Sequence, residues 1–218
     1  RNWIIPSAYY LPHHNGIDLA TGEFRRKVDA PFAEYCERAG RYALEFFQRA
    51  EEIEKQLLLN LHAPLHLTRL LLPKMIARKQ GTVVMISSMS GKSPTPYNSI
   101  YAATKHGING FVSSTRIELQ ETGVQIGVVC PSFVAEAGMW ADTGVKAPAL
   151  LREVPLQKVV EGVKRVMAGE AEVLVTPGPV RPLLALSELF PSLNAPVLRM
   201  MGVLDVLKAR DKIVQEKG

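Results

Sequence analysis

The sequence predicts an α/β fold built on a doubly wound parallel sheet, and two observations support this fold class. Between residues 82 and 176, strand-like and helix-like stretches alternate along the chain. The strand-like stretches are continuously apolar, as in VQIGVVC at 124–130, which is typical of parallel strands covered on both faces. Because ligands bind such sheets beyond the carboxyl ends of the strands, Ser88 and Pro131 are expected at a functional edge.

The elements before residue 82 are less regular than those that follow. Residues 1–30 are interrupted by proline and glycine, whereas residues 32–58 have the apolar spacing of a helix. A long helix through Lys79 is expected next, kinked or broken near Pro64, because proline gives no N–H to the preceding turn. The later elements are expected as strand 82–87, helix 99–121, strand 124–130, helix 155–168 and strand 172–176.

The tail at 182–218 is rich in Leu and Met and is broken by prolines. Its simplest interpretation is a set of short amphipathic helices that cover the core. A lid over an apolar substrate and a partner surface are the alternatives.

Composition excludes several classes of function. The net charge of +5 is mild and no basic stripe is interleaved with aromatic residues, so we expect no nucleic-acid partner. Cys36 and Cys130 lie far apart, which favours a reducing, cytoplasmic location. No run of 18 apolar residues exists and the start lacks the order of a signal peptide, so we expect a soluble protein without a transmembrane segment.

Ser88, Tyr101 and Lys105 are the candidate catalytic residues. Ser88 follows an apolar strand, Tyr101 opens the next helical stretch, and Lys105 lies on the same helix face at i, i+4. A phenol is a poor acid or base at neutral pH, but a neighbouring ammonium favours the phenolate and should lower its pKa. Tyr101 is therefore a candidate general acid/base.

These three residues resemble the Ser-Tyr-x-x-x-Lys signature of the short-chain dehydrogenase/reductases. LNLHAP at 59–64, LPKM at 72–75 and VVCP at 128–131 are similar to further segments of that family, so the resemblance covers about residues 48–181. It implies a Rossmann-like fold and an NAD(P)-dependent oxidoreductase that interconverts a carbonyl and a secondary alcohol. The substrate would be a small molecule, apolar if the tail forms a lid, and we expect a homo-oligomer.

The resemblance also implies a role for each residue of the site. Tyr101 would exchange the proton with the substrate oxygen, which Ser88 would hold. Lys105 would lower the pKa of Tyr101 and contact the nicotinamide ribose. Asn60 would hold a water that relays protons to solvent. The cofactor, NAD or NADP, would be bound by Tyr101, Lys105, Pro131, Ser132 and Val134.

The front of the chain departs from the family. The glycine-rich turn T-G-x-x-x-G-x-G is not found, and only 47 residues precede the helix that carries the asparagine. Part of the N-terminal nucleotide-binding half is therefore expected to be absent, from the recorded sequence or from the protein. Glu136 stands where the family has threonine and would bring negative charge toward the pyrophosphate.

Two functional hypotheses follow from this mixture of retained and missing motifs. The first is the oxidoreductase; the alternative is an inactive, shortened member with a structural or regulatory role. We expect a single domain over 1–218, with an atypical segment at 1–47, a catalytic part at 48–181 and the helical tail at 182–218. The segment that would distinguish NAD from NADP is not recognisable.

Other candidate sites are weaker. His62 and His66 have the i, i+4 spacing of zinc ligands, but no glutamate follows His62 and no third ligand is evident, so no metal site is expected. Cys130 ends an apolar strand and is interpreted as a packed thiol rather than a nucleophile.

Overall fold

The structure, a computed structural model, describes residues 50–136, 140–148 and 151–217. From Glu54 onward these residues belong to one compact unit. The expectations for residues 1–49 lie outside the described residues, and the single domain over the whole chain stays a prediction.

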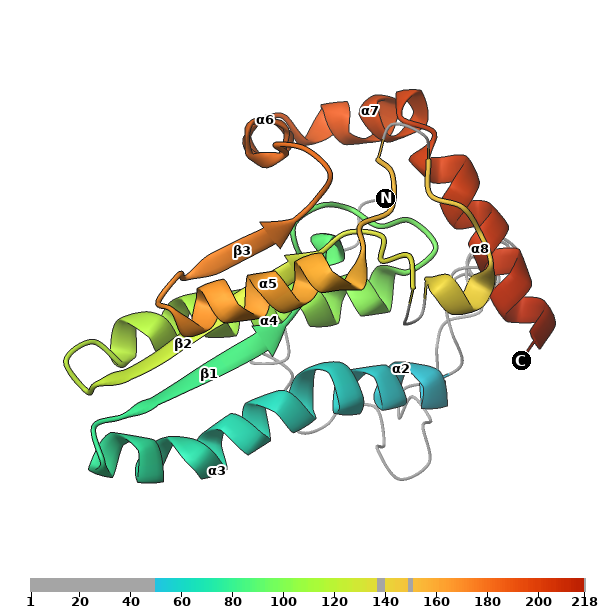
Figure 1. Cartoon of the computed structure of the whole chain (residues 1–218). Coiled ribbons are helices and arrows are strands. Elements are labelled where there is room, and N and C mark those ends of the chain that lie inside the picture. Colours follow the sequence, from blue (N-terminus) through green and yellow to red (C-terminus); the bar gives the residue numbers. More distant parts are fainter. Residues whose placement is uncertain (1–49, 137–139, 149–150, 218) are drawn as a thin grey trace, which may run out of the picture. The chain divides into compact units, whose positions relative to one another are not determined.

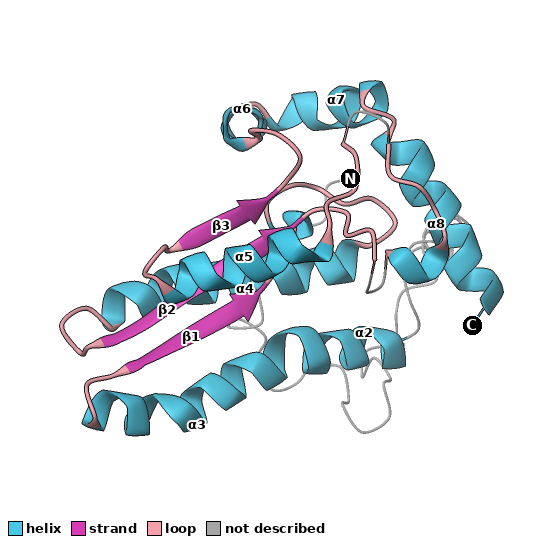
Figure 2. Ribbon diagram, viewed as in Figure 1, coloured by secondary structure: helices cyan, strands magenta, loops and turns pink. Residues whose placement is uncertain are grey.

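The sheet has three parallel strands in the order β1-β2-β3 (Figure 1): β1 is Gly81–Ile86, β2 is Val124–Pro131 and β3 is Glu172–Val175. Two helices connect them, α4 (Ser99–Glu118) between β1 and β2, and α5 (Leu156–Met167) between β2 and β3 (Figure 2). The register pairs Ile86 with Val129 and Pro131 with Val175, so the strands end at one edge of the sheet. The predicted α/β fold with a parallel sheet is confirmed.

The central strand β2 is buried on both faces, which explains its continuous apolar sequence. Ile126, Val128 and Cys130 belong to a core cluster shared with α3 (Ala63–Ala77) and α4. Val129, on the alternate face, packs in a second cluster with residues of α5 such as Val166. The two clusters place helices on both faces of the sheet, as a doubly wound fold requires.

The helical run before β1 continues through Pro64 rather than ending there. It consists of α2 (Ala50–Leu57), a π-helical turn at Leu58–His62, and α3. Pro64 lies in the first turn of α3, where a missing N–H is best tolerated, and the irregularity is taken up by the wider turn just before it. The predicted kink is therefore a π turn, and Asn60 lies within it.

The tail forms α6 (Arg181–Leu189), α7 (Asn194–Met200) and α8 (Val203–Lys217). Short helices were expected here as a cover for the core. The helices are present, but neither of the two core clusters contains a described residue beyond Val175. Their side chains instead line a cavity at the carboxyl edge of the sheet. In the part of the chain that the structure describes, no helix is both long and apolar enough to span a membrane.

Candidate active site

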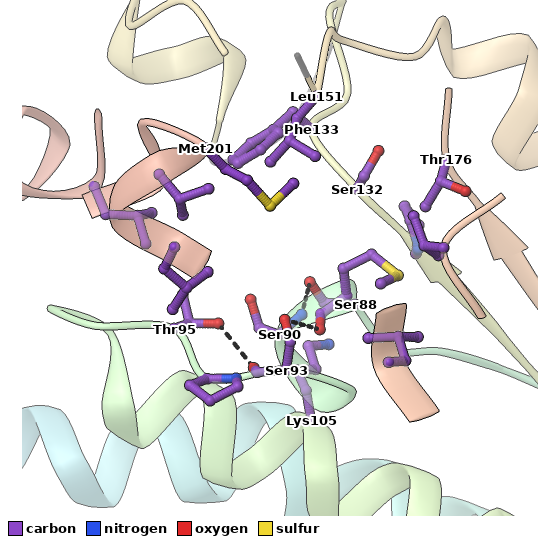
Figure 3. A pocket seen from close by; sticks show the side chains of 18 of the residues that line it. Ser88, Ser90, Ser93, Thr95, Lys105, Ser132, Phe133, Leu151, Thr176 and Met201 are labelled. Atoms are coloured by element: carbon purple, nitrogen blue, oxygen red, sulfur yellow. Dashed lines mark hydrogen bonds between the residues drawn. The ribbon is translucent and has the colours of Figure 1, made fainter. Parts of the chain in front are cut away.

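A cavity of about 420 Å³ lies beyond the carboxyl ends of β1 and β2. Six of the predicted site residues line it: Ser88, Tyr101, Lys105, Pro131, Ser132 and Val134. Figure 3 shows Ser88, Ser90 and Lys105 gathered on one side of the cavity, with Phe133 and Met201 on the other. Asn60 is not among the lining residues. The structure thus brings together the serine, tyrosine and lysine but leaves the asparagine outside their cavity.

Ser88 is oriented by the short turn that follows β1. It is the N-cap of the 3-10 turn Met89–Gly91, and its hydroxyl accepts a hydrogen bond from the N–H of Ser90 at 3.1 Å. The same side chain is hydrogen-bonded to the phenol of Tyr101. Because the cap fixes the hydroxyl, the end of β1 and the first turns of α4 meet in a defined geometry.

Lys105 is held at the end of β1 by its own side chain and backbone. Its ammonium donates a hydrogen bond to the carbonyl of Ile86 at 3.0 Å and lies 5.3 Å from the ring centroid of Tyr101. Its backbone carbonyl accepts a hydrogen bond from the Ser87 hydroxyl at 3.1 Å. Burial lowers the pKa of Lys105, because a desolvated ammonium loses hydration.

The pKa of Tyr101 is raised, which is opposite to the direction that the sequence predicted. Burial is the largest cause, since the phenolate is the charged form. The hydrogen bond with Ser88 and the charge of Arg210 act in the other direction and favour the phenolate, but they do not outweigh burial. In this structure Tyr101 is therefore a protonated phenol at neutral pH.

Arg210 is the residue of the site that sequence reasoning missed. It comes from α8, far along the chain from Tyr101, and it lines the same cavity. A signal for it does exist, because Val203, Leu207 and Arg210 have the spacing i, i+4, i+7 of one helix face, and the first two are buried.

Gly91 and Asn109 fix the turn after β1 against α4. The Asn109 amide donates a hydrogen bond to the Gly91 carbonyl at 2.6 Å and accepts one from the Cys130 thiol at 3.6 Å. A Cβ at Gly91 would lie 2.7 Å from the carbonyl oxygen of Lys105, so only glycine allows this close packing. The Cys130 thiol is fully buried, and burial raises its pKa to about 11. This agrees with a packed thiol.

Ser132 and Glu136 extend the site beyond β2. The Ser132 hydroxyl is buried, lines the cavity and has no hydrogen-bond partner among the described residues. Glu136 was expected to bring negative charge toward a pyrophosphate. Its carboxylate instead accepts a hydrogen bond from the backbone N–H of Leu156 at 2.6 Å, at the start of α5. Such an interaction with a helix N-terminus is favourable for a carboxylate and occupies it there.

No group of three or more His, Cys, Asp or Glu side chains that could hold a metal ion exists within residues 50–136, 140–148 and 151–217. His62 and His66 stack on each other with ring centroids 5.8 Å apart.

Comparison with known proteins agrees with this geometry. A family model described as short chain dehydrogenase matches residues 38–147, which is half of the chain. The chain belongs to the short-chain dehydrogenase family. The "Ketoacyl reductase HetN" of Nostoc sp. is 36% identical over 165 residues, which cover 73% of this chain and 58% of that protein. The mouse "Dehydrogenase/reductase SDR family member 7B" is 40% identical over 76 residues, 35% of this chain and 24% of that protein.

Two solved structures share the fold. One is the short-chain dehydrogenase from Sphingobium yanoikuyae in complex with NADPH, with a TM-score of 0.56 and 24% identity over 67% of this chain and 57% of that chain. The other is the bulky-bulky ketone specific alcohol dehydrogenase from Comamonas testosteroni, with a TM-score of 0.53 and 20% identity over 67% and 55% of the two chains. The chain therefore spans little more than half the length of HetN and of these two structures.

Proposed function

We propose that the protein is an NAD(P)-dependent oxidoreductase that interconverts a carbonyl and a secondary alcohol. The observation that carries this proposal is the hydrogen bond between Ser88 and Tyr101, with the Lys105 ammonium 5.3 Å from the tyrosine ring, in a cavity at the carboxyl edge of the sheet. Membership of the short-chain dehydrogenase family supports the same reaction class.

In the direction of carbonyl reduction, Tyr101 gives its phenolic proton to the substrate oxygen. Tyr101 is protonated at neutral pH and so carries the proton to be given, but its raised pKa makes it a weaker acid than a free phenol. The Ser88 hydroxyl holds the substrate oxygen beside the phenol, and its bond to Tyr101 favours the phenolate that forms when the proton leaves. Alcohol oxidation runs these steps in reverse and needs the phenolate at the start.

Lys105 positions this end of the cavity. With its ammonium bound to the Ile86 carbonyl, it places a positive charge beside the ring on which negative charge develops. Asn60 lies outside the cavity lining, so we assign it only the indirect role of holding a water that exchanges protons with solvent.

A nicotinamide cofactor, when bound, supplies or takes up the hydride of the reaction. We assign its nicotinamide end to Tyr101, Lys105, Pro131, Ser132 and Val134, all of which line the cavity. The buried Ser132 hydroxyl supports this assignment, because it has no hydrogen-bond partner among the described residues and belongs to a residue that lines the cavity.

The test is turnover by the purified chain with NADH or NADPH and a panel of apolar ketones, followed by the loss of reduced-nicotinamide absorbance. Tyr101→Phe removes only the ionisable oxygen, and we expect kcat to fall by about 10²- to 10⁴-fold. Circular dichroism of the variant checks that the fold is kept. Comparable kcat in the folded Phe variant would show that Tyr101 does not transfer the proton.

A further inference from the structure

Arg210 is a half-buried cation on the apolar face of α8. It follows the buried residues Val203 and Leu207 on the same face and lines the cavity with them. Burial lowers the pKa of Arg210, whereas Tyr101 and its neighbour Asp211 favour the charged guanidinium. A partly desolvated guanidinium is costly to bury, and an anion in the cavity would add to the stabilisation that Asp211 already gives it.

The cavity carries positive charge and no negative charge among its described lining residues. Lys105 and Arg210 are its cations, and the lining includes no Asp or Glu side chain of the described chain. The Lys105 ammonium is already bound to the Ile86 carbonyl. Asp211 is next to Arg210 in sequence but does not line the cavity. An anion that enters the cavity is therefore attracted to the guanidinium of Arg210.

The remaining wall fits an apolar body. Leu183, Leu193, Val197, Leu198 and Met201 line the cavity from α6, α7 and the turns beside them. A volume of about 420 Å³ lies within the range of small-molecule pockets. The lining thus combines one guanidinium, an apolar wall and a polar side whose hydroxyls include those of Ser88, Tyr101 and Ser90.

We propose that the substrate is an apolar oxo acid or hydroxy acid whose carboxylate is bound by Arg210 while its carbonyl or hydroxyl faces Tyr101. The planar guanidinium presents paired N–H donors that match the two oxygens of a carboxylate. One guanidinium also matches a monoanion better than a doubly charged phosphate. Arg210 and Tyr101 line the same cavity, so one small substrate can reach both with its carboxylate and its reacting oxygen. This inference deepens the proposed function and rests on it.

The test measures binding and so does not depend on turnover. Calorimetric titration compares octanoate with octan-1-ol, which share an apolar chain but differ in charge, on the unmodified chain and on Arg210→Met. We expect Arg210→Met to weaken octanoate binding roughly ten- to a hundredfold, the range of hydrogen bonds to charged groups, and to leave octan-1-ol binding unchanged. Lys208→Met is the matched control, because Lys208 is an exposed cation of the same helix and does not line the cavity.

Three results would overturn the inference: no octanoate binding by the unmodified chain, equal octanoate binding by Arg210→Met, or equal loss of both ligands in that variant. Arg210→Lys keeps the charge without the paired donors and should retain part of the octanoate affinity with full octan-1-ol affinity. If octanoate binding depends on Arg210 while no oxo acid or ketone is turned over, the proposed reaction fails and the carboxylate site stands.

Discussion

The two sides of the cavity are held in place by different forces. On the side of β1 and α4, hydrogen bonds fix the polar groups, including those from Lys105 to the Ile86 carbonyl and from Ser87 to the Lys105 carbonyl. On the side of α6 to α8 the wall is mostly apolar and open, with Arg210 as its one cation among the described lining residues, and Leu186 and Leu193 are each 42% exposed. The fixed side suits proton transfer, which needs accurate geometry. The open side suits the selection of an apolar substrate.

This difference predicts that variants of the polar side reduce kcat and that variants of the tail side change KM. Binding energy that is equal in the ground state and the transition state affects KM alone, whereas groups that act in the transition state affect kcat. A tail variant that lowers kcat, or a polar-side variant that changes KM alone, would contradict this difference between the two sides.

The largest effect among the supporting residues is expected for Lys105→Met. This variant removes the positive charge beside Tyr101 and the hydrogen bond to the Ile86 carbonyl, and we expect kcat to fall by about 10²- to 10³-fold. Lys164→Met, an exposed lysine of α5, is the control and should leave steady-state kinetics unchanged. Equal kcat in the two variants would show that Lys105 has no role in the reaction.

Gly91→Ala is expected to destabilise the fold by about 1–3 kcal/mol, the usual cost of overpacking. The added methyl would meet the Asn109 amide at 2.6 Å and the Lys105 carbonyl at 2.7 Å. Gly110→Ala is the control on α4, because a Cβ there meets nothing within 4 Å, and better helix propensity should leave it neutral or stabilised. Urea denaturation compares the two, and equal midpoints would contradict the close packing at Gly91.

The sequence could predict the elements of this fold but not all of the contacts between them. The apolar run predicted a first strand at 82–87, whereas the structure has this strand at Gly81–Ile86. The bounds differ by one residue because strand ends carry little sequence signal. The predicted helix to residue 121 ends at Glu118, since Glu121 adopts a positive φ of 70° in the turn before β2. Such turns depend on local geometry that composition alone does not determine.

The candidate site was predictable where its residues are close in sequence. Ser88, Tyr101 and Lys105 follow one strand and open the next helix, so the topology itself brings them together. Arg210 lines the cavity only because the tail folds back to it, which the sequence does not reveal. The contact of Glu136 with the N-terminus of α5 depends likewise on the path of the loop between them. The pKa of Tyr101 also depends on burial, which the spacing to Lys105 does not reveal.

The smallest effect is expected on the tail side. Met201→Ala removes apolar contact from the cavity wall, and we expect KM for an apolar ketone to rise about three- to tenfold with kcat unchanged, given about 0.8 kcal/mol per buried methylene. Met200→Ala is the matched control, because the adjacent methionine is 81% exposed. Steady-state kinetics on both variants would contradict the assignment if Met200→Ala raised KM as much as Met201→Ala.

The central claim is that Tyr101 exchanges the proton with the substrate and that Ser88 lowers the pKa of Tyr101. The most direct test compares the pH dependence of alcohol oxidation in the unmodified chain with that in the Ser88→Ala variant. Oxidation needs the phenolate, so kcat/KM should rise with pH toward and above about 10, because burial raises the pKa of Tyr101. The Ser88 hydrogen bond lowers this pKa, so its loss should move the alkaline limb to higher pH. A limb that stays in place or moves to lower pH in a folded Ser88→Ala variant would contradict the account.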